Sequence, residues 1–255
     1  MSPDGESNDL FAYAVALADD ALIHGQRLAE WVSRAPTLEE ELAIANVALD
    51  HIGRARMFYA RALEVAQDGR TEDDLAYCRD ADEFANLTIF ELPRGDFAVA
   101  VARQFLTDAF NVPFLEALAA SRDAGLAAIG EKALKESTYH LRRSRDWVLR
   151  LGDGTDESRR RMQSAIDALW GHCAELFEPF AAEQRLIARG VAVDRAALEK
   201  PWRGTIDATL ADATLHVPTT QPSPYRGRLG RHTGYLEPLL ADMQVLQRTY
   251  PGQQW

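Results

Sequence analysis

Residues 37–66 read TLEEELAIANVALDHIGRARMFYARALEVA, with apolar residues recurring at the three- and four-residue spacing of one helix face. Thr37 and Glu40 form a capping-box pattern, in which a hydroxyl and a carboxylate satisfy free amides at a helix start. The pattern predicts a long helix from Thr37 to about Ala66. The residues expected on its apolar face are Leu42, Ala45, Leu49, Ile52, Phe58 and Leu63.

Helical periodicity also dominates the rest of the chain, and no run of alternating β-branched residues predicts a sheet. The segment 217–234 contains three prolines and three glycines, so it is not expected to form a continuous helix. The sequence therefore predicts one all-α domain over residues 1–255, with residues 1–8 flexible. The other expected helices are 9–33, 96–122 with a bend at Pro113, 126–151, 155–177, 181–189, 195–214 and 235–249.

The composition restricts the classes of function. Asp and Glu number 39 against 28 Lys and Arg, giving a net charge of −11. This balance argues against a general nucleic-acid binder, whose phosphate contacts need a basic face, and against attraction to anionic membranes. Apolar runs such as Phe97–Ala102 are far shorter than the ~20 residues that span a bilayer. The polar start Met1–Asn8 does not resemble a signal peptide, and two cysteines, Cys78 and Cys173, favour a reduced cytoplasmic setting.

Two pairs of acidic residues lie at equal distances from expected turns. Asp20 and Asp50 are centred on the turn after the first long helix, and Asp108 and Glu136 are centred on the turn at residue 122. Antiparallel helices joined by a tight turn bring such residues to the same level. Four carboxylates at mid-height are typical of a di-metal carboxylate bundle.

A di-metal site of this kind also needs Glu-x-x-His on two helices, because the three-residue step puts carboxylate and imidazole on one face. Three residues after Asp50 stands Gly53, and three residues after Glu136 stands Tyr139. Neither helix therefore supplies the nitrogen ligand that iron requires. The sequence predicts that these six positions are the remains of a metal site that binds no metal.

The histidines close to these carboxylates do not restore the pattern. His51 points about 100° away from Asp50, and His140 follows Glu136 by four residues instead of three. Facing carboxylates without a metal would repel each other, so we expect cationic partners one helical turn away. The candidate pairs are Asp20 with His24, Asp50 with Arg54, and Glu136 with His140.

A basic cluster stands out in the acidic chain within the segment rich in proline and glycine. It comprises Arg226, Arg228 and Arg231, followed by His232. The cluster is a candidate for docking an acidic partner subunit or a CoA phosphate, and a solvated loop is the ordinary alternative. The sequence has no phosphate-binding glycine loop, no dinucleotide fingerprint and no Ser/His/Asp elbow.

The chain resembles, along essentially its whole length, the C subunits of ring 1,2-phenylacetyl-CoA epoxidases, which are ferritin-like helical bundles of long antiparallel helices. The stretches that carry the resemblance are Ala18–Ile23, Gly25–Trp31, Ile44–Asn46 with Leu49–Asp50, Lys135–Glu136 with Tyr139–Arg142, Leu151–Gly152 with Gly154–Asp156, Leu239–Gln244 and Pro251–Trp255.

The resemblance implies a place in aerobic phenylacetate degradation. In this family a related A subunit holds the di-iron centre and binds phenylacetyl-CoA, and a reductase subunit delivers electrons from NADPH. The C subunit pairs with the A subunit and is regarded as structural. The resemblance therefore implies a non-catalytic subunit with no cofactor of its own, in a complex with the A subunit and the other epoxidase subunits. The alternatives from the residues alone are an active di-metal oxidase and a helical scaffold unrelated to oxygenation.

Overall fold

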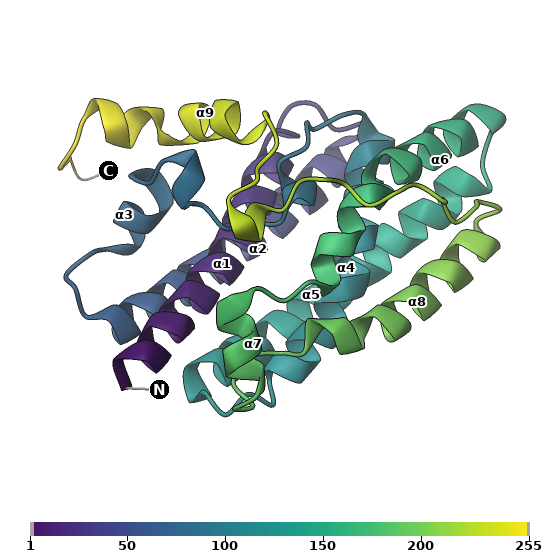
Figure 1. Ribbon diagram of the computed structural model, residues 1–255. Helices are drawn as coiled ribbons and strands as arrows, with labels where there is room; N and C mark the ends of the chain where they lie inside the picture. The colour runs from purple at the N-terminus through teal and green to yellow at the C-terminus, as the bar shows by residue number, and fades with distance from the viewer. Residues whose placement is uncertain (1–2, 254–255) are drawn as a thin grey trace. The chain divides into compact units, whose positions relative to one another are not determined.

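The computed structural model of the chain describes residues 3–253, and over that range its regular elements are all helices (Figure 1). A single isolated β-bridge joins Arg226 to Arg231. The prediction of an all-α, ferritin-like helical fold is confirmed. Residues 254–255, which end one of the stretches carrying the resemblance, and residues 1–2, predicted to be flexible, lie outside the described part. None of the helices within it is long and apolar enough to cross a membrane.

The chain divides into two compact units. The first unit consists of residues 1–93 together with 225–255, and the second consists of residues 94–224. The prediction of a single domain over residues 1–255 stays a prediction.

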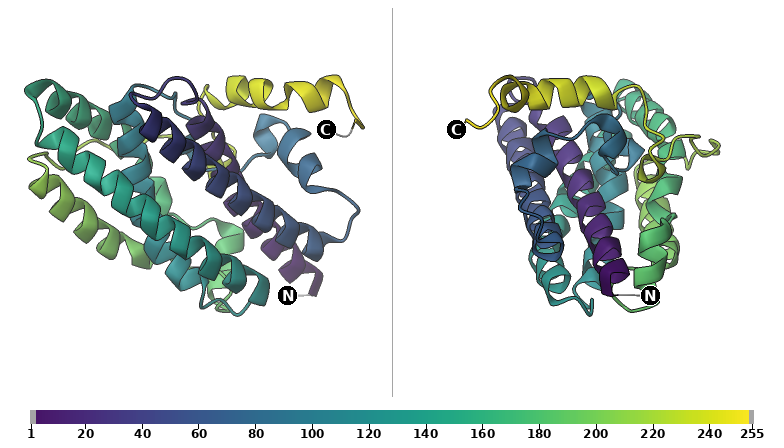
Figure 2. Two further views of the ribbon diagram at one scale, coloured as in Figure 1. Left: turned by 180° about the vertical axis from the view of Figure 1, so that it is seen from behind. Right: turned by 60° about the vertical axis from the view of Figure 1, so that its left-hand side comes forward.

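The first unit is built on a hairpin of two long helices, α1 (Pro3–Ala29) and α2 (Leu38–Ala66), which pack along each other (Figures 1 and 2). Residues 3–8, expected to be flexible, are helical because α1 begins at Pro3. The Thr37 hydroxyl accepts from the Glu40 amide, as the capping pattern predicts.

Shorter elements of the first unit follow this hairpin, and residues 225–249 return to it from the far end of the chain. We call residues 225–249 the C-terminal segment; its helix α9 packs against α3 (Figure 1). The shorter elements are α3 (Glu72–Tyr77), η1 (Ala81–Glu83), η2 (Thr88–Phe90), η5 (Gly227–Leu229) and α9 (Leu236–Thr249).

The apolar face predicted for α2 was wrong in phase. Leu42 and Leu49 are 58% and 68% exposed, whereas the buried side of the helix lies about half a turn away. Of the predicted residues Phe58 is buried, while the choice of leucines as core residues selected the outer face at Leu42 and Leu49. The buried apolar residues of α2 are Ile44, Val47, Ala48, Ala55, Phe58, Tyr59 and Ala62.

A buried ion pair joins three parts of the first unit. The Asp19 carboxylate on α1 accepts from the Tyr59 hydroxyl on α2 at 2.5 Å, from Arg79 Nη1 at 3.1 Å and from the Ala85 amide at 2.9 Å. Burial and the neighbouring Asp19 carboxylate hold the pKa of Tyr59 well above its ordinary value, so the phenol keeps its proton and donates it.

The second unit is built on another hairpin, α4 (Phe97–Leu118) and α5 (Ala124–Gly152), against which α6 (Asp156–Trp170) and α8 (Glu199–Asp212) pack. The side chains of Asp96 and Asp123 cap the two hairpin helices. The helix predicted over 155–177 ends at Trp170 and continues as 3-10 turns. The remaining elements are η3 (Gly171–Phe177), α7 (Ala181–Ile187) and η4 (Arg195–Leu198).

The second unit contains the most buried helix of the chain. Pro113 lies within α4, and nearly every residue of that helix before Pro113 is buried. The Trp202 indole on α8 donates to the Leu106 carbonyl at 2.9 Å, which fixes α8 on α4.

Replacement of Gly130 on α5 by alanine is expected to lower the free energy of unfolding by about 2 kcal/mol. The added Cβ would lie 2.6 Å from the backbone nitrogen of Ala119 at the end of α4, so the two helices would have to separate. Gly204→Ala on α8 is the matched control, because a Cβ there meets nothing within 4 Å. Helix propensity predicts a gain of up to about 1 kcal/mol for the control. Urea unfolding followed by circular dichroism measures both, and equal stability of the two variants would contradict this close approach.

Candidate functional site

The first predicted metal-site position, Asp20 on α1, is engaged by groups of its own unit. Its carboxylate accepts from the Leu87 amide at 2.7 Å and from Arg228, whose Nη1 and Nη2 lie 3.2 Å and 2.5 Å from the two oxygens. Arg228 also donates to the carbonyls of Ala16, at 2.9 Å, and Ala85. The side chains of Asp20 and Arg228 are only 16% and 3% exposed, so this is a largely desolvated ion pair.

This pairing changes the interpretation of the basic cluster. Arg228 was predicted as a docking residue, but its guanidinium is buried within its own unit and neutralises Asp20. The ring of His24, which was the expected partner of Asp20, stacks on the ring of Phe90 at 4.6 Å between centroids, and an ion pair between His24 and Asp20 stays a prediction. Arg226 is half-buried and donates to its own neighbour's carbonyl, and Arg231 is exposed. A docking role stays a prediction for Arg226 and Arg231 alone.

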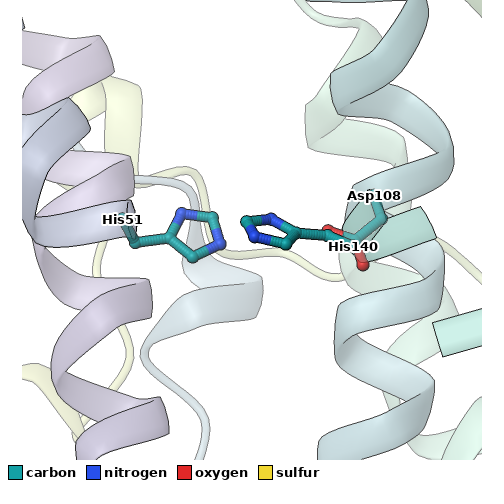
Figure 3. Close-up of side chains that lie close together, drawn as sticks. All are labelled: His51, Asp108 and His140. Carbon is teal, nitrogen blue, oxygen red and sulfur yellow. The ribbon is translucent and has the colours of Figure 1, made fainter. Parts of the chain in front are cut away.

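On α2 the predicted positions lie away from the buried side. Asp50 is half-buried, and Gly53 is exposed with nothing within 4 Å of the place where a Cβ would stand. The buried residues one position further on are His51, drawn in Figure 3, and Arg54. The ring of His51 lies 4.3 Å from that of His24 on α1 between centroids. An ion pair between Asp50 and Arg54 stays a prediction.

On the hairpin of the second unit the same shift of one residue occurs. Tyr139 is 47% exposed and Glu136 is half-buried, whereas Ser137 and His140 lie on the buried side of α5. A ring nitrogen of His140 lies within 4.8 Å of a carboxylate oxygen of Asp108, and Figure 3 shows both side chains.

The structure also brings His140 close to a residue with which the sequence did not pair it. The sequence paired His140 with Glu136, whereas the structure brings it close to Asp108 on α4. Asp108 in turn accepts from the Ser144 hydroxyl on α5 at 2.9 Å. An additional ion pair between Glu136 and His140 stays a prediction.

The donor sets of the two hairpins do not fit a ferritin-like di-metal centre. Such a centre takes a carboxylate followed three residues later by histidine on one face of a helix. In the described residues of α2, the buried residues three positions before and after His51 are Ala48 and Arg54. In those of α5, the buried residue three positions before His140 is Ser137. An arginine, always protonated and with no acceptor atom, cannot act as a metal ligand. Neither helix therefore supplies the Glu-x-x-His donor pair.

Several buried polar residues were missed by reasoning from the sequence. Asp19, Arg79 and Glu91 are at most 8% exposed, and each contributes to a hydrogen-bond network of the first unit. Arg79 is 60 residues away from Asp19 along the chain, so no helical spacing connects them. The run of two acids at Asp19 and Asp20, within an otherwise apolar stretch of helix, was the signal that could have indicated them.

Comparisons with known proteins agree with the resemblance found in the sequence. The family model for phenylacetic acid catabolic proteins matches residues 1–255. The C subunit of the 1,2-phenylacetyl-CoA epoxidase of Escherichia coli strain K12 is 48% identical over 248 residues. That match covers 97% of this chain and 100% of the relative.

Arg228→Ala is expected to destabilise the first unit by about 3 kcal/mol, because it leaves the Asp20 carboxylate without its cation in a mostly buried place. Arg231→Ala, in the same loop but exposed, is expected to change stability by no more than about 0.5 kcal/mol. Thermal unfolding of both variants beside the unchanged chain measures the difference. Similar small effects of the two substitutions would argue that the Asp20–Arg228 pair contributes little.

Proposed function

Since the chain belongs to the phenylacetic acid catabolic protein family, we propose that it is a structural, non-catalytic subunit of a 1,2-phenylacetyl-CoA epoxidase. In this proposal it pairs with the catalytic A subunit, and with the other epoxidase subunits, in the aerobic degradation of phenylacetate. The likeness to the Escherichia coli protein over nearly the whole of both chains supports the assignment to an epoxidase.

One observation carries the non-catalytic role. Asp20, the carboxylate that α1 would offer to a metal, is already neutralised by the guanidinium of Arg228. An arginine stays protonated under all conditions that a protein survives, so this positive charge is permanent. A metal ion at Asp20 would have to displace a cation held by four hydrogen bonds to two carbonyls and the carboxylate.

The remaining donor positions support the same conclusion. Gly53 and Tyr139, where histidine ligands would stand, lie on exposed sides of their helices. We therefore assign no cofactor to this chain and assign the di-iron centre to the partner A subunit. Both cysteines are free, and burial raises the pKa of Cys173 to about 12, so this thiol stays protonated and is no nucleophile. Free thiols support a cytoplasmic location.

A bundle without metal contributes to catalysis by supporting its partner. Long helices that bury a large surface against a sister subunit restrict the motion of the helices that carry the metal ligands. The outer face of α2 offers such a surface, because Leu38, Leu42 and Leu49 are 68%, 58% and 68% exposed and follow one another at helical spacing.

Iron analysis of the chain purified alone from iron-supplied cells is expected to give far fewer than one iron per chain. Co-expression of this chain with the A subunit is expected to give more soluble, iron-loaded A subunit than expression of the A subunit alone. The epoxidation of phenylacetyl-CoA by the A subunit is expected to rise as well. Two irons per chain would instead indicate an active di-metal oxidase. An A subunit that is equally stable and active alone would remove the supporting role, and co-purification with unrelated proteins only would favour a scaffold outside oxygenation.

The double substitution Leu42→Glu and Leu49→Glu is expected to weaken binding of the A subunit at least tenfold, because it places two charges on the proposed contact face. Val245→Glu with Leu246→Glu on α9 is the matched control, since those residues are similarly exposed, at 54% and 51%. Binding is measured by co-purification and by titration calorimetry. Equal affinities of the two double variants would show that this face of α2 is not the contact surface.

A further inference from the structure

A second buried carboxylate of the first unit, Glu91, is surrounded by hydrogen-bond donors. The Asn86 amide donates to Oε1 at 3.0 Å, and the Thr233 amide and hydroxyl donate to Oε2 at 2.6 Å and 2.7 Å. His232 Nδ1 lies 2.6 Å from Oε1. Three donors and a ring nitrogen of His232 therefore converge on this one buried carboxyl group.

The other nitrogen of the His232 ring also faces an acceptor. Its Nε2 lies 2.9 Å from the Phe84 carbonyl oxygen, which has no proton to give. Nε2 must therefore carry a hydrogen, and the proton between Nδ1 and Glu91 belongs to the imidazole, which is the stronger base. His232 is then positively charged, with a side chain 9% exposed beside a carboxylate with no exposure.

The arginines near this pair bind other groups or are exposed, so they do not replace His232 as the cation of the Glu91 carboxylate. Arg27 on α1 donates to the backbone carbonyl of Glu91 at 2.5 Å and to that of Tyr235 at 3.3 Å, and leaves the carboxylate to His232. Arg228 is bound to Asp20, and Arg231 is exposed. A neutral His232 keeps one ring proton, so a lone pair would face either the Glu91 oxygen or the Phe84 carbonyl, and one of the two hydrogen bonds would become a repulsion.

Along the C-terminal segment, His232 lies between two other attachments to the rest of its unit. Arg228 attaches the start of the segment to Asp20. Further on, Gln244 and Arg248 on α9 donate to the Arg79 carbonyl at 3.0 Å and 2.7 Å. Arginine and glutamine do not change charge near neutral pH, whereas histidine does. Among these attachments, the one at His232 alone is sensitive to pH in that range.

We propose that the His232–Glu91 pair is a pH-sensitive attachment, which holds the C-terminal segment while His232 is protonated and releases it when the proton is lost. A detached His232 titrates as an ordinary histidine, near pH ~6.5. The attachment is therefore fully formed below that pH. It weakens as the pH rises through the range in which the buried imidazolium gives up its proton.

Nitrogen-15 NMR of the histidine side chains in the intact chain tests the charge directly. Both ring nitrogens of His232, assigned from the resonances lost in His232→Gln, are expected to show the protonated imidazolium pattern at about pH 7.5, one unit above the ordinary histidine value. Exposed His216 is the internal reference, with whose spectrum that of His232 is compared. A neutral tautomer at His232 would overturn the proposal.

Hydrogen exchange of the intact chain between about pH 6 and 9, corrected for the intrinsic exchange rate, tests the release. Protection of amides 226–249 is expected to fall with rising pH by up to about tenfold per pH unit, the limit for one proton. In Glu91→Gln this dependence is expected to disappear, because the carboxamide can donate to a neutral imidazole. His216→Gln is expected to retain it. Protection that does not change with pH in the unchanged chain, or that changes equally in Glu91→Gln, would refute the attachment.

Discussion

A carboxylate removed from water must meet a cation or a set of donors, and the first unit depends on this constraint. Asp19 and Asp20 stand next to each other on α1, where apolar side chains surround them. Asp19 binds Arg79, which follows α3, while Asp20 binds Arg228 from the C-terminal segment. Two adjacent residues thereby hold two distant parts of the chain on one helix. Substituting either acid would affect more than its own helix, because each is the point at which another segment is attached.

The constraint also gives a structural reason for an acid at a position typical of a metal ligand. A carboxylate at Asp20 serves an arginine as well as it would serve a metal ion, since both are positive and both orient its two oxygens. A histidine at an exposed position, such as those of Gly53 and Tyr139, would have no comparable structural role. A structural subunit can therefore use the carboxylates of the di-metal pattern, but it does not need the histidines.

Much of the fold could be predicted from the sequence, because helix starts and turns depend on neighbouring residues. The cap at Thr37 and the turn near residue 122 are local features, and the structure confirms them. The buried side of α2 was mispredicted because leucines were taken as core residues, whereas Leu42 and Leu49 are exposed. The contact between Asp20 and Arg228 could not be predicted for a different reason: the two lie 208 residues apart along the chain, so no periodicity relates them. Resemblance to a family supplied the proposed function, because spacing alone left open both an active di-metal oxidase and an unrelated helical scaffold.

The first unit is assembled from two stretches that are separated by the whole of the second. During synthesis from the N-terminus, α1 and α2 leave the ribosome long before residues 225–249, and the second unit, residues 94–224, is completed between them. Asp20 and Glu91 are consequently synthesised well before their partners Arg228 and His232. A chain that ended before residue 225 would lack Arg228 and His232, so Asp20 and Glu91 would lose the side chains that cover them. We expect such a truncated chain to be recognised by chaperones and proteases more readily than the full chain.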